Sequence, residues 1–305
     1  MAKVLVATEK PFAAAAVEGI KGVLDKAGYE LALLEKYTDV SEFENAVADA
    51  DAMIIRSDKA TRNIIEKAPK LKIIVRAGAG YDNIDLAAAT EHNVVAMNTP
   101  GQNSNAVAEL ALGMMVSIAR NNYNGKSGTE LSGKKLGIHA YGNVGRLVAK
   151  IAMGFGMEVF AFDPFVEASA IEADGVKVLG SVEELYSSCQ YISLNIPAND
   201  KTKGSINFDL MSSMPKGATI VNTARKEVID EDSLKKAFAE RADFRYVSDI
   251  APVCVDELAE YEGRFFFTPK KMGAQTAEAN INAGIAGATQ IVNFLEKGDV
   301  TCKVN

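Results

Sequence analysis

Histidine, cysteine and long apolar runs are scarce in this sequence of 305 residues. The three cysteines are far apart and in no CxxC spacing, so we expect neither a disulfide framework nor a metal site, and a reducing cytosol fits the chain. The longest nearly uninterrupted apolar run, Leu110 to Val116, is far shorter than the ~18 residues that a membrane-spanning helix needs. The N-terminal apolar stretch 4–7 is too short for an export signal.

An excess of basic residues is also missing. Lys and Arg number 33 against 40 Asp and Glu, which gives a net charge of -7, and no run of basic residues exceeds two. A nucleic-acid-binding protein usually carries a basic excess or a basic stripe. We therefore expect no nucleic-acid partner and no membrane partner, and a small molecule as the substrate.

Short β-rich runs alternate with longer helical patterns along the chain, which predicts an α/β fold of doubly wound parallel sheets covered by helices. Five runs predict one small domain: 3–8, 30–34, 52–56, 72–76 and 94–97. Six more predict a second, six-stranded sheet: 135–140, 158–162, 190–196, 218–222, 245–248 and 265–268. We place short hinges near Asn98 and Gly273, and expect the functional site between the two domains.

A glycine-rich turn follows the strand-like run 135–139. It matches the pattern GxGxxG with alanine at the first position, and consists of Ala140, Tyr141, Gly142, Asn143, Val144 and Gly145. Such a turn lets the bare amides of a helix N-terminus approach a pyrophosphate. Asp163, eighteen residues after Gly145, stands near the ~20-residue offset of the carboxylate that binds a ribose 2'-hydroxyl and repels a 2'-phosphate. The pattern predicts an NAD site.

Hydride transfer also requires a general acid or base and a cation that holds the substrate. Histidine is the usual base, but His92 is expected in an exposed turn and His139 as a hydrogen-bonded core residue. Arg225 follows a strand end, and its planar fork suits a carboxylate. Lys270 and Lys271 follow the last strand, where burial and a nearby arginine would lower a lysine pKa. A surface arginine and two solvated lysines are the competing interpretations.

Two further strand ends carry cations and glycines. The stretch Arg76, Ala77, Gly78, Ala79, Gly80 offers backbone amides that could form an anion-binding nest. Arg56 and Ser57 follow a neighbouring strand. Two arginines at neighbouring strand ends suggest a substrate with more than one negative group, and charge on a solvated rim is the alternative.

These motifs resemble the D-isomer-specific 2-hydroxyacid dehydrogenases over essentially the whole chain. RAGAGYDNID at 76–85 resembles the substrate loop of the members that oxidise D-3-phosphoglycerate, and NTARKEVIDEDSL at 222–234 resembles the arginine motif. The resemblance implies a Rossmann NAD-binding domain, 99–282, inserted in a flavodoxin-like substrate domain, 1–98 with 283–305. It implies NAD-dependent oxidation of D-3-phosphoglycerate, the first step to serine, by a homodimer formed through the helical stretch 103–121.

The resemblance also implies residue roles. Arg225 would bind the substrate carboxylate and carbonyl, Asn103 the substrate side, and Asp249 the nicotinamide carboxamide. The remaining implied cofactor contacts are Asn195, Ile196, Pro197, Thr202, Thr223, Ala224 and Gly273.

Two departures from the family pattern occur together. The family usually places a histidine after Thr-Pro and a glutamate five residues beyond the position of Asp249, whereas here Lys270 and Lys271 follow Thr-Pro and Cys254 replaces the glutamate. A carboxylate orients an imidazole, and an ammonium does not need it. The position of the family's histidine coincides with Lys271 when residues are counted back from Gly273, and with Lys270 when they are counted forward from Pro269. We prefer Lys271 as the acid/base.

Two other functions compete with this prediction. One is a reductase of glyoxylate or hydroxypyruvate, and the other is a catalytically silent NAD-sensing binding protein. We also expect no C-terminal regulatory domain, because only a short polar tail follows residue 297.

Overall fold

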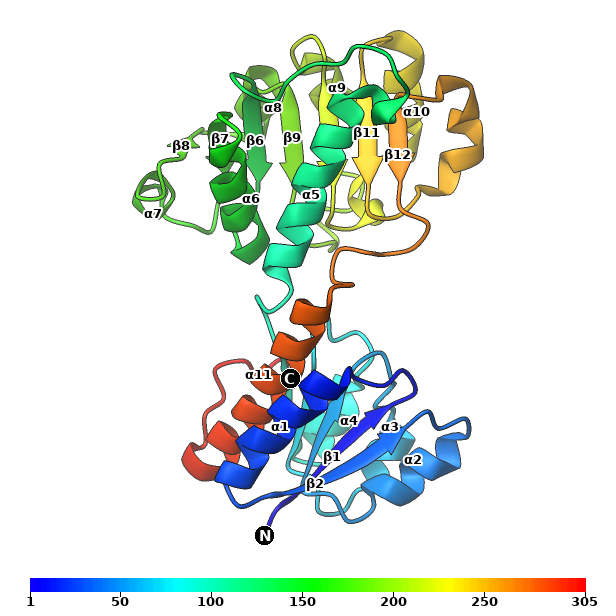
Figure 1. Ribbon diagram of the computed structural model, residues 1–305, viewed down its shortest axis with the longest axis vertical. Coiled ribbons are helices and arrows are strands. Elements are labelled where there is room, and N and C mark those ends of the chain that lie inside the picture. The colour runs from blue at the N-terminus through cyan, green and yellow to red at the C-terminus, as the bar shows by residue number, and fades with distance from the viewer. The chain divides into compact units, whose positions relative to one another are not determined.

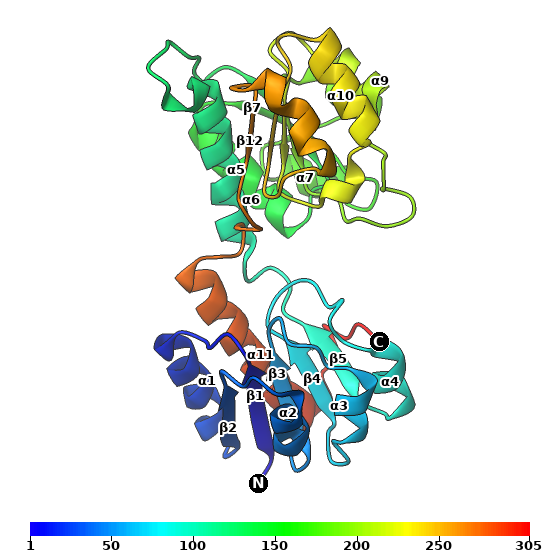
Figure 2. The ribbon, with the colours of Figure 1, turned by 90° about the vertical axis from the view of Figure 1, so that its right-hand side faces the viewer.

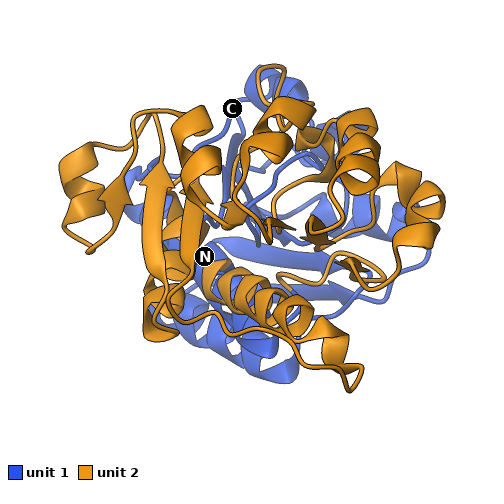
Figure 3. Cartoon of the chain, turned by 90° about the horizontal axis from the view of Figure 1, so that it is seen from above, with its two compact units in different colours: residues 1–103, 275–305 blue, residues 104–274 orange.

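The computed structural model describes residues 1–305, and contacts within the chain divide it into two compact units. Unit 1 joins Met1–Asn103 to Gln275–Asn305, and unit 2 consists of Ser104–Ala274 (Figure 3). The sequence placed these boundaries at residues 98 and 283 instead. The observed boundaries differ from the predicted ones because each segment that joins the two units ends where a long helix begins. These helices are α5 (Ser104–Ala119) in unit 2 and α11 (Ala277–Lys297) in unit 1.

Unit 1 contains a five-stranded parallel sheet in the order β2-β1-β3-β4-β5, visible in Figure 2. Its strands are β1 (Lys3–Thr8), β2 (Glu30–Glu35), β3 (Ala52–Ile55), β4 (Ile73–Arg76) and β5 (Val95–Asn98). All five predicted strands are present with bounds shifted by at most one residue. The strand order is that of flavodoxin-like folds, which confirms the prediction for this unit.

Helices cover both faces of this sheet because its strands are apolar on both sides. One face packs against α1 (Ala14–Lys26) and α11, which contribute Ile20 and Ile291 to the same core as Val4 and Val6. The other face packs against three short helices: α2 (Val40–Val47), α3 (Arg62–Glu66) and α4 (Leu86–Glu91). The C-terminal tail then covers the β5 edge, where the Val304 amide donates to the Ala96 carbonyl.

Unit 2 contains a seven-stranded parallel sheet in the order β12-β11-β10-β9-β6-β7-β8 (Figure 1). Its strands are β6 (Lys135–His139), β7 (Glu158–Phe162), β8 (Lys177–Val178), β9 (Tyr191–Leu194), β10 (Thr219–Asn222), β11 (Arg245–Ser248) and β12 (Phe265–Phe267). The expectation of six strands is wrong, because β8 has only two residues, too few for a sequence pattern. Counted within the unit, the order is 3-2-1-4-5-6 with one added edge strand, the Rossmann arrangement.

The helices of unit 2 also lie on two faces. The core beneath α5 and α6 (Asn143–Gly154) includes Leu136 and Ile138 of β6. The opposite core is covered by α8 (Val182–Ser188), α9 (Phe208–Ser213) and α10 (Glu231–Glu240). The short α7 (Ala168–Glu172) follows β7, and 3-10 turns occupy Asn121–Tyr123, Lys226–Val228 and Val253–Tyr261. No helix of the chain combines the length and the apolar character needed to cross a membrane.

His139, the last residue of β6, points to the α8 side of the sheet. Its Nδ1 lies 3.3 Å from the hydroxyl of Tyr186, and the two rings meet edge to face. Burial lowers the pKa of His139 to about 4, because a charged imidazole would lose its hydration there. The imidazole is therefore neutral near neutral pH.

This buried histidine should make unit 2 sensitive to mild acid. The unfolded chain, with a histidine pKa of ~6.5, binds more protons than the folded one between the two pKa values, so stability falls as pH drops from ~6.5 toward ~4. We expect His139 to account for a loss of about 2 kcal/mol between about pH 7.5 and about pH 5. Urea unfolding of wild type and His139→Leu at both pH values measures it. Equal losses in the two proteins would contradict the assignment.

Candidate functional site

The glycine-rich turn between β6 and α6 has the geometry that a dinucleotide site requires. Ala140, in place of the first glycine, has φ +75°, a left-handed conformation that costs a residue with a Cβ about 1–3 kcal/mol. A Cβ on Gly145 would lie 2.4 Å from the Ala140 carbonyl oxygen, so only glycine allows the helix to pack this closely on the strand. A Cβ on Gly142 would meet nothing within 4 Å, which leaves the helix N-terminus open to a phosphate.

Asp163 follows β7 and connects two loops. Its Oδ2 accepts a hydrogen bond of 2.7 Å from the Tyr141 amide, and its Oδ1 accepts one of 2.8 Å from the Phe165 amide. A carboxylate has about four lone-pair positions, so two remain for ribose hydroxyls. The predicted ribose carboxylate and the predicted glycine turn thus lie together.

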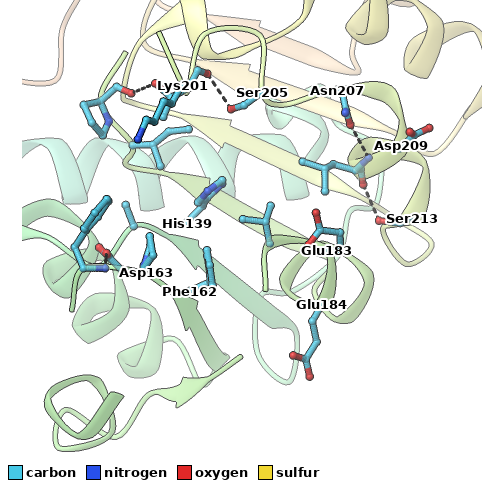
Figure 4. Close-up of a pocket in the computed structure, with 18 of the residues that line it drawn as sticks. His139, Phe162, Asp163, Glu183, Glu184, Lys201, Ser205, Asn207, Asp209 and Ser213 are labelled. Atoms are coloured by element: carbon cyan, nitrogen blue, oxygen red, sulfur yellow. Dashed lines mark hydrogen bonds between the residues drawn. The ribbon is translucent and has the colours of Figure 1, made fainter. Parts of the chain in front are cut away.

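A cavity of about 1000 Å³ opens beside this turn, wholly within unit 2 (Figure 4). The cavity lies by the ends of β6 and β7 and the loop after β9, next to the point where the strand order reverses. Four predicted cofactor-site residues line it, Asp163, Ile196, Pro197 and Thr202, and so does Ala140 of the glycine-rich turn. Sequence reasoning missed its other side, formed by residues of α8 and α9, because no motif marks those helices.

Two buried polar atoms, just after β9 and β10, have no hydrogen-bond partner within the chain. The Asn195 side-chain oxygen and the Thr223 hydroxyl make no hydrogen bond, although both residues belong to the predicted cofactor set. Buried polar groups are normally satisfied, so an unsatisfied pair at strand ends indicates a ligand that would complete them. The open Gly142 amide region and these atoms fit a bound dinucleotide. No group of three or more His, Cys, Asp or Glu side chains comes together that could hold a metal ion.

The loop after β10 presents Arg225. Asn222, which is buried, accepts from the Ala224 amide at 3.0 Å and donates to the Arg225 carbonyl at 2.9 Å. The guanidinium itself is exposed, with one nitrogen 3.0 Å from the Ala224 carbonyl. Sequence reasoning missed Asn222 as the residue that shapes this loop; an asparagine at the end of an apolar strand was the available signal.

Asp249 holds the loop that carries the two lysines. Its Oδ1 accepts from the Thr268 hydroxyl at 3.0 Å and from the Met272 amide at 2.6 Å, and its Oδ2 accepts from the Gly273 amide at 2.8 Å. The carboxylate is 3% exposed. The structure therefore gives Asp249 a role in fixing the lysine loop, and its predicted contact with nicotinamide stays a prediction.

Lys270 and Lys271 are both exposed on that loop, so the burial that was expected to lower a lysine pKa is not found. The strands β10, β11 and β12 pair in level register, with Asn222 opposite Ser248 and Ser248 opposite Phe267. The arginine loop and the lysine loop therefore leave the same edge of the sheet.

Cys254, at the position of the missing glutamate, is a buried thiol. Its backbone amide and that of Val253 each donate to the Glu231 carboxylate at 2.8 Å. Burial first, and the nearby Glu231 carboxylate second, raise the pKa of the thiol to about 11. Cys254 thus carries no charge near neutral pH and cannot replace the glutamate.

The predicted phosphate-binding residues lie in unit 1, at the ends of β3 and β4. Arg56 donates to the carbonyls of Lys10 and Pro11 at 3.1 and 3.3 Å and to the Asn280 side chain. Burial lowers the Arg56 pKa, although a guanidinium remains charged. The Nε of Arg76 donates to the Arg56 carbonyl at 3.0 Å. The two arginines are thus adjacent, as predicted.

Some backbone amides of the glycine-rich loop after β4 already donate hydrogen bonds within the chain. Those of Ala77 and Gly78 donate at 2.8 Å to the Ile55 and Arg76 carbonyls, which leaves the amides of Ala79 and Gly80 for an anion. Ser57 is exposed and Asn103 is half-buried. His92 is exposed, as expected.

Comparisons with known proteins agree with this geometry. Residues 109–257 match the NAD binding domain of the D-isomer specific 2-hydroxyacid dehydrogenases. The D-3-phosphoglycerate dehydrogenase of Methanocaldococcus jannaschii is 38% identical over 83% of this chain and 51% of its own length, so the chain spans about half of that relative. The hydroxypyruvate reductase of Thermotoga maritima is 34% identical over 84% of this chain and 88% of its own length.

One solved structure is similar over the whole chain. It is the NAD+-bound 3-phosphoglycerate dehydrogenase of Entamoeba histolytica, with a TM-score of 0.87 and 47% identity, covering 100% of this chain and 98% of that one. Similarity of this extent, on a chain with both the Rossmann turn and the arginine loop, assigns the protein to one family. The chain belongs to the D-isomer specific 2-hydroxyacid dehydrogenases.

Proposed function

We propose that the protein catalyses the NAD-dependent oxidation of D-3-phosphoglycerate to 3-phosphohydroxypyruvate, the first step to serine. The observation that carries this proposal is the full-length similarity to the NAD+-bound enzyme of that name from Entamoeba histolytica. The adjacent arginines Arg56 and Arg76 support it, because a phosphorylated hydroxy acid has two anionic groups. A cytosolic location is supported by the three cysteines, which stand far apart in the sequence and are typical of a reducing compartment.

Unit 2 would hold the cofactor. The amides at the start of α6 suit the pyrophosphate, Asp163 the adenosine ribose, and the 1000 Å³ cavity the base. Asn195 and Thr223 offer their unsatisfied polar atoms to the remaining part of the dinucleotide. When bound, NAD accepts the hydride that leaves C2 of the substrate.

Cationic side chains and backbone amides would hold the substrate. Arg225 binds the carboxylate and polarises the C2 oxygen as it becomes a carbonyl. Arg56, Arg76 and the amides of Ala79 and Gly80 bind the phosphate, with Ser57 and Asn103 as further contacts. Lys271 would accept the proton of the C2 hydroxyl, on a loop that Asp249 holds in place.

The lysine assignment predicts a clear difference between neighbouring residues. Lys271→Ala should lower kcat for D-3-phosphoglycerate by about 10²–10⁴, the range for loss of a general base, and leave NADH binding intact. Lys270→Ala, on the same exposed loop, is the matched control and should retain most of the activity. NADH formation and calorimetric NADH binding measure the two effects. Loss of turnover in Lys270→Ala alone would instead assign the base to Lys270.

Hydroxypyruvate and glyoxylate serve as comparison substrates, because the Thermotoga maritima relative is named a hydroxypyruvate reductase. We expect kcat/KM to be higher for 3-phosphohydroxypyruvate than for either. The reverse order would replace the proposed substrate, and tight NADH binding without turnover of any of them would indicate a sensor.

Asp163 should select NAD over NADP through its charge. Asp163→Asn keeps an acceptor of nearly the same shape but removes the repulsion of a 2'-phosphate, so the ratio of the Kd values for NADPH and NADH should fall about tenfold. Asp174→Asn, a carboxylate in the same unit bonded to the Tyr141 hydroxyl, is the control. An unchanged ratio in Asp163→Asn would show that this carboxylate does not contact the ribose.

We also expect a homodimer formed through unit 2. A shallow groove of about 450 Å³ lies between α5 and α6 and includes Phe155, which is 44% exposed. Light scattering should give twice the 32.5 kDa mass of the chain, and Phe155→Glu should shift it toward the monomer. A wild-type monomer would contradict the dimer.

A further inference from the structure

The cavity of unit 2 contains a buried polar side chain with no role in the chemistry above. His139 lines the cavity and is only 8% exposed (Figure 4). The hydrogen-bond partners of its two ring nitrogens determine which kind of ligand the imidazole could bind.

The Nδ1 side is occupied by Tyr186. The Tyr186 hydroxyl is fully buried, and the His139 Nδ1 at 3.3 Å is its hydrogen-bond partner. If Nδ1 carried the proton, the tyrosine proton would have no acceptor, and a buried donor without an acceptor is destabilising. The tyrosine therefore donates to Nδ1, and the imidazole proton lies on Nε2.

The Nε2 side makes no hydrogen bond within the chain. The cavity that His139 lines has apolar side chains, among them Phe162, Ile196 and Leu210, together with polar and charged ones, which include the Asp163 carboxylate. A donor in a cavity that also offers apolar side chains and the proposed ribose carboxylate fits a flat ring that has a nitrogen acceptor on its rim. A purine base has this chemistry.

We propose that His139 is a base-recognition residue, whose Nε2–H donates a hydrogen bond to a ring nitrogen of the adenine of NAD. The inference rests on the proposed NAD binding in unit 2 and adds a specificity contact to it. Nε2 carries a proton in this neutral tautomer and in the imidazolium alike, so the proposed donor does not depend on the charge of His139.

Ligand fragments separate this contact from the rest of the cofactor site. His139→Leu should weaken binding of AMP and of NADH about five- to tenfold, the effect of losing one buried neutral hydrogen bond. It should leave the Kd of reduced nicotinamide mononucleotide, which lacks adenosine, unchanged. Calorimetry on the full chain gives the three constants. Wild-type affinity of His139→Leu for AMP would overturn the inference.

Tyr186→Phe tests whether His139 acts only as the partner of a buried tyrosine. This variant removes the Tyr186 hydroxyl, but an acceptor on AMP still selects the tautomer with the proton on Nε2, so AMP affinity should fall less than in His139→Leu. A loss in Tyr186→Phe as large as that in His139→Leu would assign His139 a packing role and overturn the proposal.

The wild-type protein offers a test that needs no variant. The chain has only two histidines, so nitrogen-15 spectra of the imidazoles show two sets of signals, and exposed His92 in unit 1 is an internal reference. AMP should shift the Nε2 resonance of His139 and not that of His92. No shift at saturating AMP overturns the inference while NADH binding and turnover still stand. A wild type that binds neither AMP nor NADH would overturn the proposed function together with it.

Discussion

The parallel register of the unit 2 sheet is the constraint on which the candidate site depends. Because β6, β7, β9, β10, β11 and β12 all run in one direction, every loop that carries a predicted functional residue of this unit leaves the same edge. At three of those strand ends, a polar side chain accepts hydrogen bonds from backbone amides of these loops. Asp163 accepts from the Tyr141 amide, Asn222 from the Ala224 amide, and Asp249 from the Met272 and Gly273 amides.

These bonds explain how the loops that carry exposed cations are held in place. Arg225 and the two lysines extend from loops with little apolar burial of their own, so the loops need another source of order. Buried or half-buried carboxylate and amide groups supply it through charge-assisted or directed hydrogen bonds. The same device stabilises the left-handed Ala140, whose neighbour Tyr141 is bonded to Asp163.

The sequence predicts most of the fold because burial on both faces produces visible apolar runs. Val4 to Ala7 of β1 is such a run, and it packs alternately into the two cores of unit 1. The strand β8 could not be predicted, since two residues form no pattern. The glycine fingerprint was predictable because a close approach and a left-handed turn restrict residue type directly.

Hydrogen-bond partners were beyond the reach of the sequence. Asp249 binds donors 19 to 24 positions later, and Arg56 binds Asn280 at a separation of 224 positions, distances over which no local pattern operates. Sequence reasoning could also place His139 in a strand but not beside a cavity, because the cavity is made by α8 and α9 from later parts of the chain.

The division of unit 1 between the two ends of the chain has a consequence for how the protein is made. Unit 2 is continuous in sequence, so a ribosome completes it before α11 is synthesised. Until then, the sheet face that α11 shares with α1 lacks the side chains of Ala283, Ala288 and Ile291. The nascent unit 1 therefore exposes an apolar surface throughout the synthesis of unit 2, and this core closes only once α11 has been made.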